Sequence, residues 1–234
     1  PLSIADFKNS SETNILASIN VIDYCSAKKI PLVYASSSAV YGNLDLGDDE
    51  VKEVDLLSPY AADKFSMELY AGVANKLHNL SSVGLRFFNV YGPRQDPSSP
   101  YSGVISIFVD RMIKGEPIII NGGHQTRDFI FVDDVVKCLF KSLLLAQDKV
   151  LFETVNVLTG VSTSVDRLAD ILADKIGYLV NKKYQPLEKG DVEQSRGTQN
   201  KMSIIFSLKD TSLTEISVGL ELTINALKLE YDSE

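Results

Sequence analysis

Strand-like and helical patterns alternate along the first half of the chain, and this alternation limits the fold more than any other feature. Short apolar runs at residues 30–35 and 82–88 indicate buried strands, and longer periodic patterns at residues 11–28 and 59–78 indicate helices. Parallel strands are joined by crossovers long enough to hold such a helix. The sequence therefore predicts βαβ units, in which helices cover a parallel sheet.

The second half of the chain mixes the two patterns in another order. A stretch rich in Gly, Pro and Ser occupies residues 91–103. Beyond it, the patterns predict helices near 104–114, 133–147, 164–176 and 212–229, and strands near 117–120, 127–132, 154–158 and 180–184. We expect an α/β fold with part of a Rossmann doubly wound parallel sheet in residues 1–95. A smaller α+β substrate domain should occupy residues 96–234, with some segments returning to the first domain.

Composition and charge exclude several classes of partner. The chain has 234 residues, 44% of them hydrophobic, and a formal net charge of -8. An acidic chain offers no basic surface for nucleic acid or an anionic membrane. Its apolar runs fall short of the ~20 residues of a membrane span. Cys25 and Cys138 read as small buried residues, so cytoplasm is the expected compartment.

Three kinds of side chain form a candidate catalytic group. Tyr60 and Lys64 are spaced YxxxK, and they follow the serines of residues 36–38. On a helix this spacing places the two side chains on one face, about 5–6 Å apart at Cβ. The Lys64 cation would favour ionised Tyr60, making it a base near neutral pH, while a serine hydroxyl would hydrogen-bond a reacting oxygen. The same spacing is also typical of an ordinary exposed pair.

A glycine-rich turn that would bind a pyrophosphate is missing from this sequence. No GxGxxG motif follows a strand-like segment. We expect that an amino-terminal portion with the first βαβ units belongs to the protein but not to this chain. The chain by itself should bind a dinucleotide poorly.

Four ordered blocks carry a family resemblance. They are VYASSSAVYG at residues 33–42, SPYAADK at 58–64, LRFFNVYGPR at 85–94 and QTRDFIFV at 125–132. In order and spacing they resemble the extended short-chain dehydrogenase/reductases. Within that superfamily the chain is most similar to NAD-dependent nucleotide-sugar epimerases, especially UDP-sugar 4-epimerases.

The resemblance implies a catalytic triad and a cofactor. Ser37 matches the catalytic Ser/Thr, Tyr60 the acid/base, and Lys64 the lysine that binds the nicotinamide ribose and lowers the tyrosine pKa. In such enzymes the tyrosinate takes the proton of the sugar 4-hydroxyl while NAD accepts the hydride from C4, which gives a transient 4-keto sugar. Ser37 could equally be the cap of a turn after a strand.

Further residues match the cofactor side of the family's site. Asn14 and Phe88 match residues near the nicotinamide, although Asn14 could be a helix-surface amide and Phe88 a core residue. Ala35 and Ser36, at the end of the first strand-like run, complete the cofactor residues together with Tyr60 and Lys64.

The substrate side of the resemblance involves both halves of the chain. Arg127 should bind the diphosphate, unless it is a surface arginine paired with Asp128 or Asp133. Val104 lies where the family closes the uridine pocket, and Asn89 where it contacts the sugar diphosphate. The other expected substrate residues are Ser37, Ser38, Asp191 and Ser195.

Two positions bear on the choice of substrate. Glu188 stands where relatives carry a second diphosphate arginine, and a carboxylate there would repel the substrate. Ser195 stands where epimerases of plain hexoses carry tyrosine and those that accept N-acetylated sugars carry a small residue. We expect UDP-N-acetylglucosamine/N-acetylgalactosamine as substrates, with UDP-glucose/galactose remaining open, and a role in polysaccharide biosynthesis.

Two rival functions and the assembly complete the expectations. A nucleotide-sugar 4,6-dehydratase would need an Asp-Glu pair where this chain has Ser38 and Ala39, and a non-catalytic sugar-nucleotide scaffold is the alternative of another class. No metal site is expected, because His124 has no acidic or cysteine partners in sequence. Family members pair two long helices per subunit into a homodimer contact, which here would need exposed apolar residues such as Leu16, Met67 or Leu69, although each could equally belong to the intrachain core.

Overall fold

The structure of the chain is a computed structural model that describes residues 2–187, 191–207 and 213–232. It divides into two compact units. Unit 1 comprises Pro1–Phe88, Val136–Val157 and Gly197–Lys209, and unit 2 comprises Asn89–Val135, Leu158–Arg196 and Asp210–Glu234.

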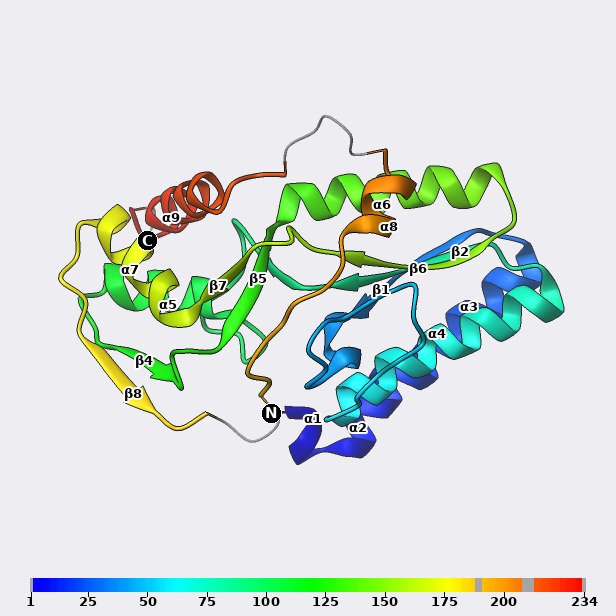
Figure 1. Cartoon of the computed structure of the whole chain (residues 1–234), viewed down its shortest axis with the longest axis horizontal. Coiled ribbons are helices and arrows are strands. Elements are labelled where there is room, and N and C mark those ends of the chain that lie inside the picture. The colour runs from blue at the N-terminus through cyan, green and yellow to red at the C-terminus, as the bar shows by residue number, and fades with distance from the viewer. Residues whose placement is uncertain (1, 188–190, 208–212, 233–234) are drawn as a thin grey trace. The chain divides into compact units, whose positions relative to one another are not determined.

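Helices and strands alternate along most of the described chain (Figure 1). The helices are α1 (Leu2–Ala5), α2 (Phe7–Ser11), the π-helix η1 (Glu12–Leu16), α3 (Ala17–Lys28), the 3-10 helix η2 (Ser38–Tyr41), α4 (Pro59–His78), α5 (Val104–Ile113), α6 (Val132–Asp148), α7 (Val165–Ile176), α8 (Asn200–Ile205) and α9 (Ile216–Asp232). The strands are β1 (Leu32–Ser37), β2 (Ser82–Phe87), β3 (Asn89–Tyr91), β4 (Ile118–Asn121), β5 (Thr126–Phe131), β6 (Phe152–Val157), β7 (Ser162–Ser164) and β8 (Lys182–Gln185).

Unit 1 contains a parallel sheet in the order β1-β2-β6. The register pairs Ser37 with Phe87 and Phe87 with Val157, so the three strands end at the same level. At one point of the sheet, Gly84 of β2 lies beside Tyr34 of β1, and a Cβ at Gly84 would come within 2.6 Å of the tyrosine ring. Only glycine leaves room there for the aromatic side chain.

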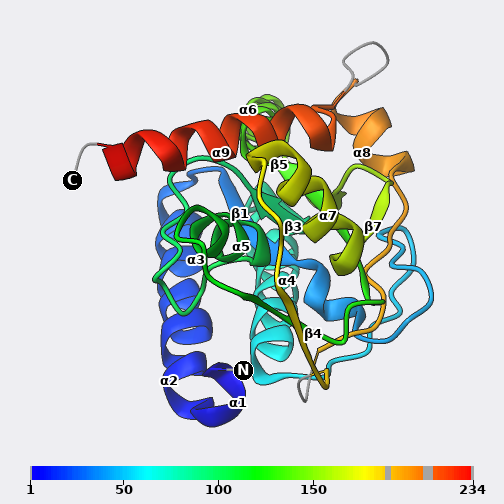
Figure 2. The ribbon, with the colours of Figure 1, turned by 90° about the vertical axis from the view of Figure 1, so that its left-hand side faces the viewer.

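Helix α4 is bounded by clear sequence signals. The Ser58 hydroxyl accepts a hydrogen bond from the Ala61 amide at 3.1 Å, and Pro59 occupies the first helical position. Asn79 ends the helix in the left-handed conformation with φ of 56°. Helices α3 and α4 lie side by side (Figures 1 and 2). Their contact contains a buried apolar cluster of Ile22, Cys25, Tyr34, Met67, Ala71, Ala74 and Leu80.

A buried polar network crosses the sheet of unit 1 just before the strands end. Arg86 of β2 lies in register with Ser36 of β1 and Asn156 of β6. Its guanidinium binds the Glu68 carboxylate through two hydrogen bonds, from Nε to Oε1 at 2.9 Å and from Nη2 to Oε2 at 2.7 Å. Its Nη1 donates to the Tyr41 hydroxyl at 2.7 Å. Such an ion pair persists in the interior only when its hydrogen-bonding capacity is used.

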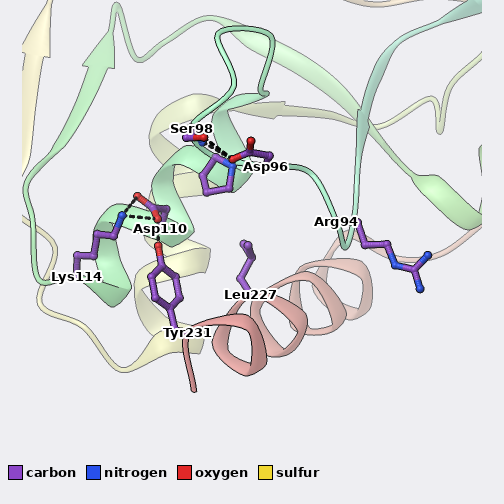
Figure 3. A pocket seen from close by; sticks show the side chains of 8 residues that line it. Arg94, Asp96, Ser98, Asp110, Lys114, Leu227 and Tyr231 are labelled. Carbon is purple, nitrogen blue, oxygen red and sulfur yellow. Dashed lines mark hydrogen bonds and ion pairs between the residues drawn. The ribbon is translucent and has the colours of Figure 1, made fainter. Parts of the chain in front are cut away.

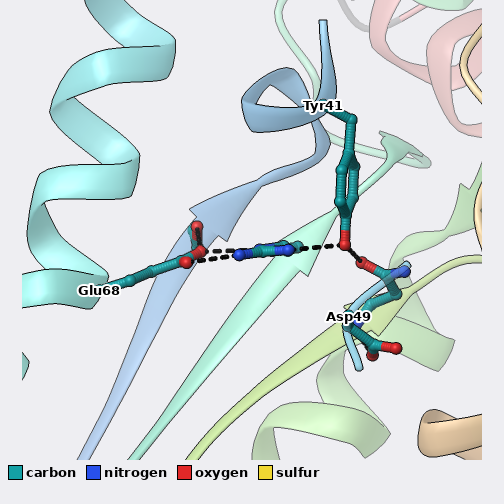
Figure 4. Close-up of polar contacts among 6 residues, drawn as sticks. Tyr41, Asp49 and Glu68 are labelled. Carbon is teal, nitrogen blue, oxygen red and sulfur yellow. Dashed lines mark hydrogen bonds and ion pairs between the residues drawn. The ribbon is translucent and has the colours of Figure 1, made fainter. Parts of the chain in front are cut away.

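The network continues on both sides of the arginine (Figure 4). The Ser36 hydroxyl donates to Glu68 at 2.5 Å, and the Tyr41 hydroxyl donates to the Asn156 side chain at 2.7 Å. The Asn156 amide N–H donates to Asp49 at 2.7 Å. Helix α4, the ends of three strands and the loop after β1 are thus joined by one set of hydrogen bonds.

Unit 2 is an α+β unit with sheets of its own. Strand β5 pairs in parallel with β3 and antiparallel with β7, and β4 pairs in parallel with β8. Helices α5, α7 and α9 pack together in this unit (Figure 2). Their apolar faces and β5 enclose a core that includes Phe108, Met112, Phe131, Leu168, Leu172 and Leu220.

The α/β fold predicted from the sequence is confirmed, with several differences in detail. Strand β1 begins two residues later than the apolar run suggested and includes Ser36 and Ser37. The predicted helix at 11–28 consists of the end of α2, a π-helix and α3. Strands β3 and β7 and helix α8 were not predicted, because three to six residues give too little periodicity. The division into an NAD-binding and a substrate-binding domain stays a prediction.

The predicted dimer contact requires exposed apolar residues on the two long helices. Leu16 and Leu69 are 56% and 55% exposed, as an outer contact would need. Met67 is buried between α3 and α4, so for this residue the alternative that it belongs to the intrachain core is confirmed: helical spacing points it at α3. The homodimer itself stays a prediction.

We expect Glu68→Gln to lower the free energy of unfolding by about 3–5 kcal/mol, because the Arg86 cation would remain buried without its counter-charge. Urea denaturation measures the change. The matched control is Glu12→Gln, which removes the exposed pair between Lys8 and Glu12, 3.6 Å apart, and should cost about 0–1 kcal/mol. Equal losses in the two variants would contradict the importance of the buried pair.

Candidate active site

The end of β1 carries the serines of the candidate site. Ser36 points into the interior and donates to Glu68, whereas Ser37 is the last strand residue and is partly buried. The Ser37 hydroxyl also accepts a hydrogen bond from the Ala39 amide at 3.1 Å, which caps the helix η2 that begins at Ser38. The capping role considered for Ser37 is therefore real, and it holds the hydroxyl in a fixed direction.

Helix α4 brings Tyr60 and Lys64 to the same strand end. Lys64 Nζ donates to the Ala35 carbonyl oxygen at 3.0 Å and lies 5.7 Å from the centroid of the Tyr60 ring. The Ser37 side chain lies close enough to Tyr60 to lower the pKa of its hydroxyl. Ala35, Ser37, Tyr60 and Lys64 thus form one cluster, in which Lys64 hydrogen-bonds the strand and Tyr60 approaches Ser37.

Burial and neighbouring side chains set the electrostatics of this cluster. Burial raises the pKa of the Tyr60 hydroxyl, and the nearby Ser37 side chain opposes this effect. Burial lowers the pKa of the Lys64 ammonium, and the nearby Asp63 carboxylate opposes that effect. Desolvation of the phenolate thus has the largest effect on the Tyr60 pKa, and its lowering by Lys64 in the complete site stays a prediction.

The two other residues expected on the cofactor side have defined surroundings. Asn14 lies in the π-helix η1, and its amide donates to the Ser10 carbonyl oxygen at 3.0 Å. Phe88 follows β2 and is 6% exposed, with its ring centroid 6.4 Å from that of Tyr41. Both lie in unit 1. Their contacts with a cofactor stay predictions.

The expected substrate residues of unit 2 gather at the start of β5. Arg127 is partly buried, and its Nη1 donates to the Thr126 carbonyl oxygen at 2.9 Å. Burial lowers the pKa of Arg127, and the Asp191 carboxylate opposes this. The Ser195 amide donates to the same Thr126 oxygen at 3.1 Å. Residues far apart in sequence therefore meet here through pairing of the segment 193–195 with β5.

Other predicted substrate residues lie near this strand or on a neighbouring element. The Asn89 side chain donates to the Asp128 carbonyl oxygen at 3.0 Å. Asp128 accepts hydrogen bonds from Thr159, so the pairing with Arg127 that we considered is not what occupies this carboxylate. Val104 begins α5 and packs against the core of unit 2. Glu188 lies outside the described residues.

A cavity in unit 2 is separate from these positions. Its lining includes Asp110 and Lys114, at the carboxyl end of α5, whereas Val104 begins that helix (Figure 3). Asp110 forms an ion pair with Lys114 at 2.9 Å and also accepts a hydrogen bond from Tyr231. These contacts satisfy the charges within the chain.

Two negative findings concern the described residues. Within them, no group of three or more His, Cys, Asp or Glu side chains could hold a metal ion. None of the helices among the described residues is both long and apolar enough to cross a membrane.

Sequence reasoning missed the residues that support the cluster. Glu68 stands four residues after Lys64, and Asp63 stands directly before it. Both carboxylates are buried, at 4% and 5% exposure. The helical spacing of Glu68 from Lys64 was the available signal, but the partner residues Arg86, Ser10 and Ser11 are distant in sequence.

Comparison with known proteins agrees with this geometry. The sequence model of the NAD dependent epimerase/dehydratase family matches residues 2–157. A UDP-glucose 4-epimerase of Mycolicibacterium smegmatis is 32% identical over 198 residues, which cover 83% of this chain and 62% of that protein. The chain thus spans less than two thirds of this curated relative.

Solved structures are similar over nearly the whole chain. A UDP-N-acetylglucosamine 4-epimerase from Methanobrevibacter ruminantium, in complex with UDP-N-acetylmuramic acid, has a TM-score of 0.89 and 32% identity, covering 98% of this chain and 73% of that chain. A UDP-glucose 4-epimerase of Thermotoga maritima with UDP-glucose has a TM-score of 0.89 and 30% identity, covering 98% and 74%. The family model, the sequence identity and the fold agree: the chain belongs to the NAD-dependent epimerase/dehydratase family.

Proposed function

We propose that the protein is an NAD-dependent 4-epimerase of a UDP-sugar, with UDP-N-acetylglucosamine and UDP-N-acetylgalactosamine as its substrates. The observation that carries this proposal is the meeting of Ser37, Tyr60 and Lys64 at the carboxyl end of β1. Ligands of open parallel sheets bind at this end of the strands. Membership of the family and the similarity to epimerases of known structure support it.

The chemistry of the cluster fits the nicotinamide side of NAD. Lys64 offers a half-buried ammonium, and Tyr60 a hydroxyl beside it, which are suitable donors for a ribose. NAD bound here would supply the acceptor and donor of a hydride for C4 of the sugar. Asn14, Ala35, Ser36 and Phe88 are proposed to line the same side.

The protein side chains handle the proton that accompanies this chemistry. The Tyr60 phenol first gives up its own proton to solvent, and the resulting phenolate then takes the proton of the sugar 4-hydroxyl and later returns it. A donor at Ser37 stabilises that phenolate or the oxygen at C4. Lys64 supplies a positive charge at the other side of the ring, which favours the phenolate further once the site is closed to water.

The start of β5 is proposed to bind the nucleotide part of the substrate. Arg127 carries a planar set of donors that suits a diphosphate, and its partial burial lowers the competition from water. Asp191 reduces the charge of this site until the substrate arrives. Asn89 and Val104 are proposed to contact the diphosphate and the uridine.

The identity of the sugar is proposed from Ser195. Ser195 has a small side chain and lies on the segment that pairs with Thr126, the residue directly before Arg127. The family resemblance implies that a small residue at this position accompanies N-acetylated substrates. The similar Methanobrevibacter ruminantium structure is a UDP-N-acetylglucosamine 4-epimerase, which supports the same choice.

We expect Tyr60→Phe in the full-length protein to lower turnover of UDP-N-acetylglucosamine by about 10²–10⁴-fold, because the acid/base group is lost while the ring remains. Conversion to the 4-epimer is measured by chromatography. Tyr101→Phe, at a tyrosine that is 81% exposed, is the matched control and should retain full activity. Unchanged turnover in Tyr60→Phe would contradict its role, and a wild-type protein without NAD or turnover would favour the scaffold.

For Ser195→Tyr we expect kcat/KM for the N-acetylated sugars to fall on the order of 10²-fold relative to the plain hexoses, since the ring would fill the space of the acetamido group. Both sugar pairs are assayed with the same preparation. Ser195→Ala keeps the space and should keep the selectivity. The gatekeeper idea is wrong if the two variants have the selectivity of the wild type.

A further inference from the structure

A buried carboxylate lies between the two candidate catalytic residues of α4. Asp63 is 5% exposed and stands directly before Lys64. Its two oxygens accept hydrogen bonds from two consecutive serines, from Ser10 Oγ to Oδ2 at 2.7 Å and from Ser11 Oγ to Oδ1 at 2.9 Å. The serines precede Asp63 by more than fifty residues, so this contact joins distant parts of unit 1.

The two serines behave differently from other helical serines of this chain. Ser18, Ser26 and Ser66 each donate to the carbonyl oxygen four residues earlier, which is the local choice of a serine in a helix. Ser10 and Ser11 instead turn toward Asp63. Hydrogen bonds to an ionised acceptor are shorter and stronger than neutral ones, and a buried carboxylate is costly without them.

The contact leads directly to Asn14. The Asn14 amide donates to the Ser10 carbonyl oxygen at 3.0 Å and lies 3.5 Å from the Ser10 hydroxyl. Both serines end α2, and the π-helix η1 with Asn14 follows at once. A π-helical turn is less favourable than an α-helical one and usually persists where other contacts hold it. Asp63, Ser10 and Asn14 form one continuous set of hydrogen bonds.

We propose that Asp63 is a positioning residue for the reaction: it holds the π-helix that carries Asn14 against α4, and it places a negative charge beside Lys64. This inference rests on the proposed function, because it assigns a purpose to the cluster of Tyr60 and Lys64. It concerns residues of this chain that the family resemblance did not single out.

The charge part of the proposal depends on what surrounds Lys64. On its own helix the charged neighbours are Asp63 and Glu68, and Glu68 is engaged by Arg86. Strand β1 contributes the neutral Ala35 carbonyl oxygen, and Tyr60 of α4 contributes its ring. Lys8 and Glu12, in the segment before α3, pair with each other at the surface.

The sign of the effect follows from these neighbours. Burial lowers the pKa of Lys64, and the Asp63 charge raises it. Removing the Asp63 charge removes the effect that opposes burial. The pKa of Lys64 therefore falls, and Lys64 loses its proton at a lower pH. If Lys64 must be charged for turnover, activity then declines earlier on the alkaline side.

Three variants of the full-length protein separate the two parts of the role. Asp63→Asn removes the charge and keeps the shape. Ser10→Ala with Ser11→Ala removes both hydroxyl donors and keeps the charge. Asp23→Asn, at an exposed position of α3, is the control for loss of one acidic charge.

Two measurements are applied to each variant. Amide hydrogen exchange of residues 7–17 reports on the π-helix, and we expect exchange on the order of tenfold faster in Asp63→Asn and in the double serine variant. Titration of Lys64 by nitrogen-15 NMR, assigned with Lys64→Met, and the pH profile of epimerisation report on the charge. Both should shift to lower pH in Asp63→Asn and stay in place in the serine variant and the control.

The outcomes are distinct. Unchanged exchange in Asp63→Asn and in the serine variant overturns the positioning role. Faster exchange with an unmoved Lys64 titration reduces Asp63 to a structural residue and also overturns the proposal. A wild-type protein that does not epimerise UDP-sugars would refute the proposed function, but exchange and lysine titration would still decide on Asp63, since neither needs turnover.

Discussion

The buried guanidinium of Arg86 sets a constraint that the rest of unit 1 must meet. An ion in the interior is tolerated only if all its partners are in place, and here they come from α4, η2 and, through them, from β1 and β6. Because Ser36, Arg86 and Asn156 share one register across three strands, the network fixes the strands immediately before their ends. Ser37 follows this level by one residue on β1, and Lys64 donates to the Ala35 carbonyl oxygen one residue before it. The network, which contacts no substrate in our proposal, therefore fixes the strand end that the candidate catalytic residues contact.

The acid/base behaviour of the cluster follows from competition between burial and charge. Desolvation raises the pKa of Tyr60 and lowers the pKa of Lys64. Ser37 opposes the first effect, and Asp63 opposes the second. A tyrosine that is neutral in the free protein must be ionised before it can accept the proton of the sugar hydroxyl, so its phenolate has to be stabilised when the reactants bind. In the proposed cycle the proton then passes from the sugar to Tyr60 and back to the sugar.

Sequence periodicity predicted the long helices and buried strands, and short-range spacing predicted the site residues that are close together in the sequence. Long helices such as α4 and buried strands such as β2 gave clear periodicity, and the spacing of Tyr60 and Lys64 was readable because a helix brings them together. Strand β1 was placed too early because its last residues, Ser36 and Ser37, are polar, and their burial depends on Glu68 and Tyr60. Met67 could not be assigned to the core or to an outer face, since both faces of α4 carry apolar residues. The roles of Asp63 and Arg86 were out of reach, as both depend on partners that only the folded chain brings near.

The run of three serines at the end of β1 acquires a different meaning beside Tyr34 and Gly84. Suppose that β1 shifted by one residue, so that Ser37 took the place of Ser36. A hydroxyl would still face Glu68, and another would still lie at the strand end. The hydrogen bonds alone would therefore hardly distinguish the two registers. The same shift would put Ala35 in the place of Tyr34 and leave a void above Gly84, which is a large packing loss. The serines at the end of β1 could replace one another chemically, but Tyr34 fits beside Gly84 in only one alignment. This packing fixes the register of β1, and with it which serine lies beside Tyr60.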